Sequence, residues 1–387
     1  MRKNLDHSKP FNEHSKTQKK RGWYMRYRKI QAKYKVATPM FLSGGDQDKA
    51  ELRVVSIKGV LRFWFRATAL SQYDSWLKVK EAEQLLFGSA DAGQGAFLIK
   101  IHSKQIDKSV NRDWFKFGSN YLGYGLDKTK TSRQYIKPGG VFTIEVIFKP
   151  GTSDDCVAAI KRSLIALGLF GGLGARSRRG YGSLSLESLT VDNNEVWNKP
   201  KNQQDLLSLL NNFIEELGQL PVELPEYTAF SKKSRIALTI TNNNPMKLLN
   251  IMGREMMNYR GAKTNPIFKQ DAAKIIRLTK GQTIEEHPQR IVFGLPHNYY
   301  FPRPFKESIS INANELQRRA SPLFIHIHEL ENSYVSILTL LPAVFLPKNQ
   351  KIFLSCKKAN RSVNTNVNYN VIHNFIDSFA NRLEVTI

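Results

Sequence analysis

The chain has 387 residues, and 58 lysines and arginines against 33 acidic residues give it a net charge of +25 at pH 7. Hydrophobic residues make up 41% of the chain, which excludes fibrous and wholly disordered proteins, and the length predicts two domains. A compact body with this charge repels itself unless a polyanion neutralises it. Nucleic acid is therefore the leading partner class, with an anionic membrane surface as the alternative.

The composition also indicates a compartment. Cys156 and Cys356 are the only cysteines, too few for a disulfide framework or a cysteine-rich zinc site. No stretch approaches 18 consecutive apolar residues, and the first residues lack the apolar segment of a secretory signal. We therefore expect a cytoplasmic protein without a metal ion or other cofactor.

The beginning of the chain is strongly basic. Residues 1–35 contain twelve lysines or arginines and two acids. Up to residue 22 this composition predicts a flexible arm. Such an arm can lie along a phosphate backbone or remain a solvated tail, and both interpretations stay open.

The first expected domain covers residues 23–190. In chain order, its predicted elements are a strand over 34–42 that Pro39 disturbs, a helix over 57–70 capped by Ser56, strands over 97–101 and 141–148, a helix over 154–169 capped by Ser153 or Asp154, and a strand over 184–189. The order β-α-β-β-α-β is that of the ferredoxin-like fold, whose sheet leaves one face free for a ligand.

Residues 191–225 are predicted to connect the two halves, with one amphipathic segment over 206–217. The second expected domain, residues 226–387, repeats the order more loosely. Its predicted elements are a strand over 236–240, a helix over 246–259, a strand over 290–293, a hairpin of 323–327 with 334–341, a helix over 371–383 and a strand over 385–387. The predicted fold class is α+β, with two ferredoxin-like (RRM-like, β-α-β-β-α-β) domains in tandem.

Residues 49–70 carry a regular pattern of charge. The apolar residues of the predicted helix share one face, which would pack against the sheet: Leu61, Trp64, Phe65 and Thr68. Lys58, Arg62 and Arg66 recur every four residues on the opposite side, where they repel one another on an isolated helix. A passing phosphate chain would relieve that repulsion, so we predict that they contact RNA, together with Lys49 and Arg53. A solvated basic face is the alternative.

Residues 171–182, GGLGARSRRGYG, lie between the second predicted helix and the last strand of the first domain. Glycines let the backbone approach a ligand closely, and arginines offer planar forks to phosphate oxygens. No G-K-[ST] follows, which excludes a Walker P-loop. The loop also argues against the membrane-surface alternative, because lipid headgroups do not require close approach of the backbone. The residues predicted to bind RNA here are Gly171, Gly172, Gly174, Arg176, Arg178, Arg179, Gly180 and Tyr181. A mobile surface hairpin is the alternative.

Three blocks together resemble a known family. Residues 38–67 contain Thr-Pro-x-Phe-Leu, Lys-Ala-Glu-Leu-Arg and Ser-Ile-Lys-Gly-x-Leu-Arg-Phe-Trp-x-Arg; residues 171–182 look like the RAMP glycine-rich loop; and residues 318–323 read Arg-Arg-Ala-Ser-Pro-Leu. The chain therefore resembles RAMP-superfamily proteins of the type III-B CRISPR Cmr module, in particular its first-named subunit. The first block is specific, whereas the glycine loop alone would fit several RAMP relatives.

The resemblance implies two fused ferredoxin-like RAMP domains in a ribonucleoprotein that silences invading RNA. It implies a structural subunit that binds guide (CRISPR) RNA and complementary target RNA near the 3′ end of the guide. Its expected neighbours are the sixth-named subunit and the repeated backbone subunit of the module. Target cleavage in that family belongs to the backbone subunit, so we expect no catalytic residues here.

A metal-dependent ribonuclease is the alternative from a different class. His326 and His328 would face one way on a predicted strand, and Asp46 lies in a glycine turn near the basic helix. The histidines can equally be packed, and Asp46 can form an Asx turn. Residues 299–301, Tyr-Tyr-Phe, could stack on bases, although a turn packed into the core is the favoured interpretation.

Overall fold

The computed structural model describes residues 27–103, 106–126, 133–301, 307–313, 315–316 and 318–387. The predicted basic arm, residues 1–22, lies outside the described residues, as does Trp23. Among the described residues, no helix is long and apolar enough to cross a membrane.

The first sheet consists of β1 (Lys29–Val36), β4 (Phe97–Ser103), β7 (Val141–Phe148), β8 (Leu184–Val191) and β9 (Asn194–Glu195). Its strand order is β4-β7-β1-β8-β9, and all neighbours are antiparallel. Every second residue of β1 is buried, from Ile30 to Val36, because apolar residues alternate with polar ones. The strand predicted over 34–42 was wrong in both bounds: it begins earlier, where lysines on its outer face mask the alternation, and it ends at Val36.

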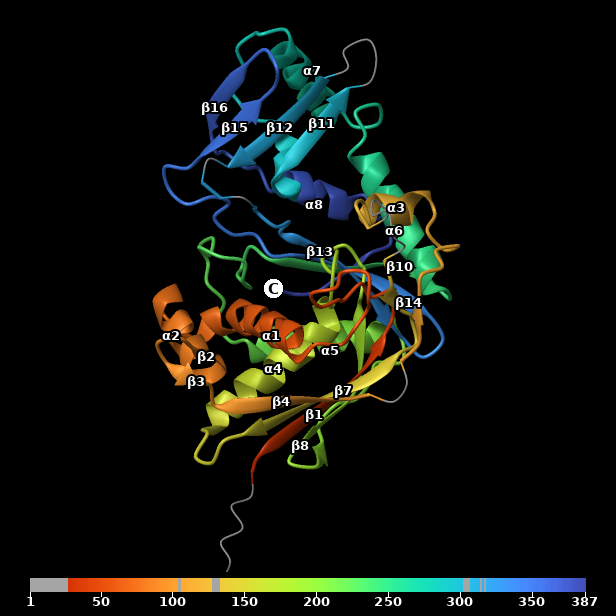
Figure 1. The fold of residues 1–387 in the computed structure, drawn as a ribbon, viewed down its shortest axis with the longest axis vertical. Helices are drawn as coiled ribbons and strands as arrows, with labels where there is room; N and C mark the ends of the chain where they lie inside the picture. Colours follow the sequence, from red (N-terminus) through yellow and green to blue (C-terminus); the bar gives the residue numbers. More distant parts are fainter. Residues whose placement is uncertain (1–26, 104–105, 127–132, 302–306, 314, 317) are drawn as a thin grey trace, which may run out of the picture.

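Two long helices, α1 (Val54–Ala69) and α4 (Asp154–Phe170), pack with this sheet in one hydrophobic core (Figure 1). The α1 residues predicted to face the sheet are buried, which confirms that prediction: Leu61, Trp64, Phe65 and Thr68. Ser153 caps α4, as predicted, by accepting a hydrogen bond from the Cys156 amide. The predicted Ser56 cap of α1 is wrong, because the helix begins earlier and Arg53 is its N-cap, without a side-chain hydrogen bond.

Seven short elements of the first half were not predicted: η1 (Leu70–Gln72), α2 (Trp76–Phe87), β2 (Gly88–Ser89), β3 (Gly93–Gln94), β5 (Lys108–Ser109), α3 (Phe117–Leu122) and β6 (Tyr135–Ile136). Helix α2 packs against α1. Its helical period is hard to read from the sequence because Val79 and Phe87 are buried while Leu77 and Leu85 are exposed.

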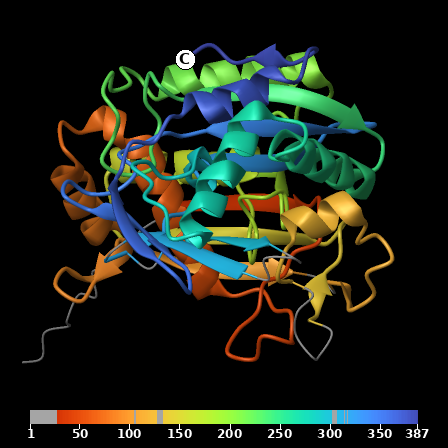
Figure 2. The ribbon, with the colours of Figure 1, turned by 90° about the horizontal axis from the view of Figure 1, so that it is seen from above.

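The predicted connecting segment contains α5 (Gln203–Glu216), whose amphipathic pattern is confirmed. Leu206, Leu210 and Phe213 are buried in the core of the first sheet. The Thr386 amide donates to Asn211 Oδ1 over 3.0 Å, and Figure 2 shows the C-terminal segment running beside α5. The segment is therefore packed structure on the first core.

The second sheet consists of β10 (Arg235–Asn242), β13 (Leu323–Glu329), β14 (Tyr334–Leu340) and β17 (Leu383–Glu384). Its order, β13-β14-β10-β17, repeats that of the first sheet: the first strand lies between the third and the fourth, with the second at an edge. All neighbours are again antiparallel. Helices α6 (Pro245–Tyr259) and α8 (Asn370–Asp377) pack on it in a second core. The predicted bounds over residues 371–387 were wrong. Helix α8 ends at Asp377 instead of residue 383, and strand β17 covers Leu383–Glu384 instead of residues 385–387.

A third sheet was not predicted: β11 (His297–Phe301), β12 (Glu307–Ala313), β15 (Lys351–Ser355) and β16 (Asn360–Asn364), beside α7 (Pro266–Thr279). The predicted strand at residues 290–293 is wrong, because this buried run forms the 3-10 helix η2 (Gln289–Phe293). The carboxylate of Asp271 accepts the amides of Gln289 and Arg290, which anchors the start of that turn.

Strand β13 belongs to two cores, and all its residues are buried. Phe324 packs in the first core, 5.7 Å from the Trp64 ring between centroids, whereas Leu323 and Ile325 belong to the second. The second sheet thus lies between the layer of α1 and α4 and the layer of α6 and α8 (Figure 1).

Candidate nucleic-acid interface

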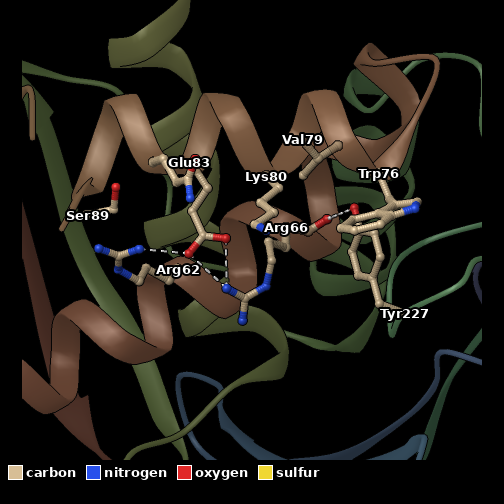
Figure 3. Close-up of a pocket in the computed structure, with 9 residues that line it drawn as sticks. Arg62, Arg66, Trp76, Val79, Lys80, Glu83, Ser89 and Tyr227 are labelled. Carbon is tan, nitrogen blue, oxygen red and sulfur yellow. Dashed lines mark hydrogen bonds and ion pairs between the residues drawn. The ribbon is translucent and has the colours of Figure 1, made fainter. Parts of the chain in front are cut away.

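The basic row of α1 meets an acid that its own helix does not supply. Arg62 Nη1 donates to Glu83 Oε1 of α2 over 2.9 Å, and Arg66 Nη1 reaches both Glu83 oxygens over 2.9 and 2.8 Å (Figure 3). Glu83 is nearly buried, while both arginines keep about a third of their side chains exposed. One carboxylate shared by two guanidiniums leaves a net positive charge between the helices.

Lys58 lies at the other end of this row. Its ammonium is 5.8 Å from the centre of the Phe97 ring, on the edge strand β4. Desolvation, followed by the charge of Arg62, lowers the pKa of Lys58. The row therefore faces α2 and the edge of the first sheet, and its predicted contact with RNA stays a prediction.

The glycines of residues 171–182 allow the backbone of the loop to lie close to other segments of this chain. Gly174, Gly180 and Gly182 have positive φ angles of 88°, 80° and 59°. A Cβ at Gly174 would lie 2.5 Å from the carbonyl oxygen of Phe41, and one at Gly180 would lie 2.8 Å from Leu249 Cδ1. The close approach predicted toward a ligand is thus made, at these two positions, to neighbouring segments.

Part of the predicted RNA-binding set is buried, which corrects the prediction for those residues. Tyr181 has no exposed surface, and its hydroxyl donates to the Ser119 carbonyl over 2.8 Å. Gly171, Gly172 and Gly180 are buried as well. These four residues support the loop from inside and cannot touch an RNA strand in this arrangement.

Arg178 joins three parts of the fold. Its guanidinium lies 4.9 Å from the Phe63 ring of α1 and 4.5 Å from the Phe324 ring of β13. Its Nη1 donates to the Ser321 carbonyl over 2.6 Å. Burial lowers the pKa of Arg178 to about 10, so the group is still charged at neutral pH.

Two further arginines lie beside it. Arg260, at the end of α6, is 8% exposed and 4.7 Å from the centre of the Phe293 ring. Burial, together with the charges of Arg290 and Arg179, lowers the pKa of Arg260 to about 10. Burial also lowers the pKa of Arg179. Across the described part of the chain, no carboxylate forms an ion pair with Arg178, Arg179 or Arg260.

A cavity of about 20 Å³ lies between these arginines. It is lined by Tyr121, Leu122, Arg178, Arg179, Met256, Arg260, Phe293, Ser321, Leu323 and Ile325. A space of this size holds one water-sized group, such as a single phosphate oxygen. Sequence reasoning missed Arg260, because nothing in the residues around the end of α6 indicates that it meets the glycine loop.

Arg176 is the exposed arginine of the loop. It has a positive φ of 64°, and its Nε donates to the Tyr124 carbonyl over 3.0 Å. Desolvation lowers its pKa, and the charge of nearby Arg318 lowers it further. Arg318 belongs to the third block of the family resemblance, so two of the blocks meet at this surface.

Lys49 and Arg53 lie on the segment that leads into α1. Lys49 Nζ is 3.3 Å from Asp46 Oδ2, and Arg53 Nε is 3.1 Å from Glu51 Oε1. Asp46 Oδ1 accepts the Asp48 amide over 3.0 Å, as in an Asx turn. This hydrogen bond and the one from Lys49 lower the pKa of Asp46.

The two strand histidines are buried between the halves. His326 Nδ1 lies 2.7 Å from the Gly171 carbonyl oxygen, and its Nε2 lies 3.4 Å from His328 Nδ1. Burial lowers the pKa of His326 to about 4, so its ring is neutral at pH 7. The described residues hold no group of three or more histidine, cysteine or acidic side chains suited to a metal ion. In strand β11, Tyr299 is nearly buried and Tyr300 is 72% exposed, so residues 299–301 are not the core-packed turn that was favoured.

Comparison with known proteins shows which family this chain is similar to. Residues 33–185 match the model of the RAMP superfamily. The CRISPR system Cmr subunit Cmr1-1 of Pyrococcus furiosus is 28% identical over 323 residues, covering 77% of this chain and 82% of the relative. The Cmr subunit Cmr1-2 of the same organism is 29% identical over 175 residues, covering 39% of this chain and 91% of the relative.

Solved structures share the fold over nearly the whole chain. The apo crystal structure of Cmr1 from Pyrococcus furiosus has a TM-score of 0.60 at 23% identity, covering 92% of this chain and 98% of that one. A chain of the cryo-EM structure of the type III-B Cmr-beta bound to cognate target RNA has a TM-score of 0.53 at 12% identity. The match covers 91% of the present chain and 99% of that one.

Residues 33–185 are therefore similar to the RAMP superfamily, and both sheets of the chain repeat one strand order. Over most of its length, the chain is similar to the Cmr1 subunits of the CRISPR Cmr module. The resemblance stated from residues 38–67, 171–182 and 318–323 is confirmed.

Proposed function

We propose that this protein is a non-catalytic RNA-binding subunit of a cytoplasmic type III-B CRISPR effector. It would hold guide RNA and complementary target RNA near the 3′ end of the guide, beside the sixth-named and the repeated backbone subunits. The names of the relatives support membership of a Cmr assembly.

The observation that carries RNA binding is the cluster of Arg178, Arg179 and Arg260. A buried guanidinium stays charged, and burial of a charge is costly unless an anion or a hydrogen-bond acceptor compensates it. Aromatic rings and one carbonyl compensate part of that cost, and no carboxylate of the described residues does so. A phosphodiester oxygen is the anion that fits both the small cavity and the chain's net charge of +25.

Exposed cations outside the cluster add to the positive charge of the first half. Lys49, Arg53 and Arg176 keep their charged groups accessible or partly accessible to solvent. They would act on phosphates, which position an RNA without reading its sequence. Lys58, Arg62 and Arg66 would take part from the side of α2.

We infer that the two halves are ferredoxin-like RAMP domains in tandem. The equal strand order of both sheets supports this inference. The domains would span residues 23–190 and 226–387. The packing of α5 on the first core favours assigning most of residues 191–225 to the first domain.

The non-catalytic role is supported by where the candidate catalytic groups lie. His326 and His328 are buried between the halves, and the Asp46 oxygens are engaged by Asp48 and Lys49. Replacing Asp46 with Asn, or both histidines with Gln, should leave target cleavage by the reconstituted complex within a few-fold. A hundred-fold loss in a variant that still folds and assembles would favour the ribonuclease alternative, since loss of a general base or metal ligand costs on the order of 10² or more.

The test of RNA binding is the salt dependence of affinity for single-stranded RNA, measured by fluorescence anisotropy. Replacing Arg260 with Met keeps most of the buried volume and removes the charge. We expect weaker binding for all RNA sequences and a slope of log K against log salt smaller by about 0.7 per lost phosphate contact.

The matched control is Arg162→Ala, which removes one positive charge on α4, where Arg162 donates to Gln72 over 2.8 Å. Its slope should equal that of the wild type. Unchanged slopes in both Arg260→Met and Arg179→Met, with normal melting temperatures, would contradict the proposal. Binding to anionic vesicles that RNA cannot displace would favour the membrane alternative.

A further inference from the structure

A second cavity lies between α1 and α2, and two arginines of the basic row, Arg62 and Arg66, line it. It has a volume of about 420 Å³ and is lined by Arg62, Arg66, Trp76, Val79, Lys80, Glu83, Gln84, Ser89 and Tyr227 (Figure 3). This volume lies in the range of sites that bind small organic ligands.

The charge of this cavity is positive. Three cations, Arg62, Arg66 and Lys80, face one carboxylate, Glu83, which both arginines share. Lys80 is exposed, with its ammonium 6.0 Å from the centre of the Trp76 ring. An anionic group would therefore be attracted to the space between Arg66 and Lys80.

The same cavity presents an aromatic surface. Trp76, the first residue of α2, is 40% exposed, an unusual exposure for a side chain of its size. The Tyr227 hydroxyl donates to the Arg66 carbonyl over 3.1 Å, which fixes the Tyr227 ring at the same end of the cavity (Figure 3). A flat ring entering here can stack on Trp76.

An aromatic platform and clustered cations are what a nucleotide needs: a ring to stack on and a partner for the phosphate. We propose that the cavity between α1 and α2 binds one nucleotide of single-stranded RNA, with the base on Trp76 and the phosphate between Arg66 and Lys80. This inference rests on the proposed RNA-binding function and adds a base-stacking site to it, distinct from the arginine cluster of the glycine loop.

The site can be tested in the full-length protein with small probes. Calorimetric titration should show saturable binding of adenosine 5′-monophosphate, weaker binding of adenosine, and no comparable binding of inorganic phosphate. Trp76→Ala should weaken nucleotide binding roughly tenfold, because stacking of one base contributes about 1–3 kcal/mol. Trp76→Phe should restore most of it.

Leu77→Ala is the matched control, since Leu77 is the next residue of α2, is 53% exposed and does not line the cavity. It should bind the nucleotide like the wild type. Equal affinities in Trp76→Ala and the wild type, with unchanged melting temperatures, would overturn the inference. So would binding of an acidic peptide that depends on Trp76 without binding of the nucleotide, because the cavity would then receive a protein partner.

The outcome also separates this inference from the proposed function. A wild-type protein that binds the nucleotide but not single-stranded RNA would overturn the proposed function, and the cavity would then be a site for free nucleotides only. A protein that binds RNA with the expected salt dependence, and whose nucleotide affinity ignores Trp76, would overturn the site alone.

Discussion

Glu83 is a single carboxylate between the guanidiniums of Arg62 and Arg66. The charge of this one residue therefore affects the stability of the fold and the net charge between α1 and α2. Removing its charge leaves Arg62 and Arg66 close together without a carboxylate between them, although Arg62 still donates to the carbonyls of Phe87 and Gly88. The two arginines then repel each other, and each becomes available to an external anion.

We expect Glu83→Gln to lower the free energy of unfolding by about 1–2 kcal/mol, since charged hydrogen bonds from two partly exposed arginines to a nearly buried carboxylate are lost. The same variant should bind single-stranded RNA more tightly at low salt. Urea denaturation and fluorescence anisotropy measure the two effects. If stability and affinity both stayed at the wild-type level, the shared carboxylate would have no energetic role.

His326 carries a pH dependence whose sign follows from its burial. Its pKa in the folded protein is about 4, below the usual 6.5, so between these pH values the unfolded chain binds more protons. Its contribution to stability is complete above pH 6.5 and is lost as the pH falls toward 4. The loss should reach on the order of 3 kcal/mol at pH 4.

The measurement is the urea midpoint between pH 7.5 and pH 4.5 in the wild type and in His326→Gln. The variant should lose less stability on acidification than the wild type, although other buried groups titrate in both. Parallel pH profiles would show that the imidazole of His326 does not titrate with folding.

At the scale of elements, the loop of residues 171–182 depends on one close backbone contact. Gly174→Ala places a methyl group 2.5 Å from the Phe41 carbonyl oxygen at a φ of 88°. We expect a loss of roughly 2–4 kcal/mol, because strain and a backbone clash add. Gly139→Ala, at a φ of 90° with open space around the new Cβ, should cost only about 1 kcal/mol.

The difference between these two variants isolates the close approach from the cost of positive φ. Thermal or urea unfolding measures both. Equal losses would mean that only the dihedral angle matters and that the Phe41 segment can move aside.

The elements that the sequence predicts are those whose burial repeats with a regular period. The α1 face around Trp64 and the alternation in β7 are examples. Helix α2 was not predicted because Leu77 and Leu85 are exposed and obscure its helical period. The strand predicted at residues 290–293 was wrong because a short buried apolar run fits a strand and a 3-10 turn equally well.

The candidate site was predictable only where its residues are neighbours in sequence. The glycine loop could be recognised from its composition. Its contacts with Arg260 and Phe324, and the pairing of α1 with Glu83, join residues that are tens to hundreds of positions apart. Local patterns carry no information about such contacts, so the burial of Tyr181 could not be foreseen either.

At the scale of the molecule, the second sheet is buried on both faces. Phe324 of β13 packs with the first core, and Ile325 of the same strand packs with the second. Separating the halves would expose apolar surface on both. We expect one cooperative thermal transition, with equal calorimetric and van't Hoff enthalpies, in scanning calorimetry. Two resolved transitions would contradict this shared packing.

The third sheet is built from two excursions of the chain. Strands β11 and β12 precede the hairpin of β13 and β14, whereas β15 and β16 follow it, and the two excursions are joined in the sheet by the pairing of β12 with β15. Pairing of β12 with β15 closes a loop that contains β13 and β14. Once these two strands have formed their hairpin, the flexible part of the loop is shorter, and the entropic cost of closing it is lower. Folding would thus have an order, with the third sheet assembled late on a finished scaffold. In evolution, the same arrangement allows this part to change while the paired sheets and the glycine loop remain in place.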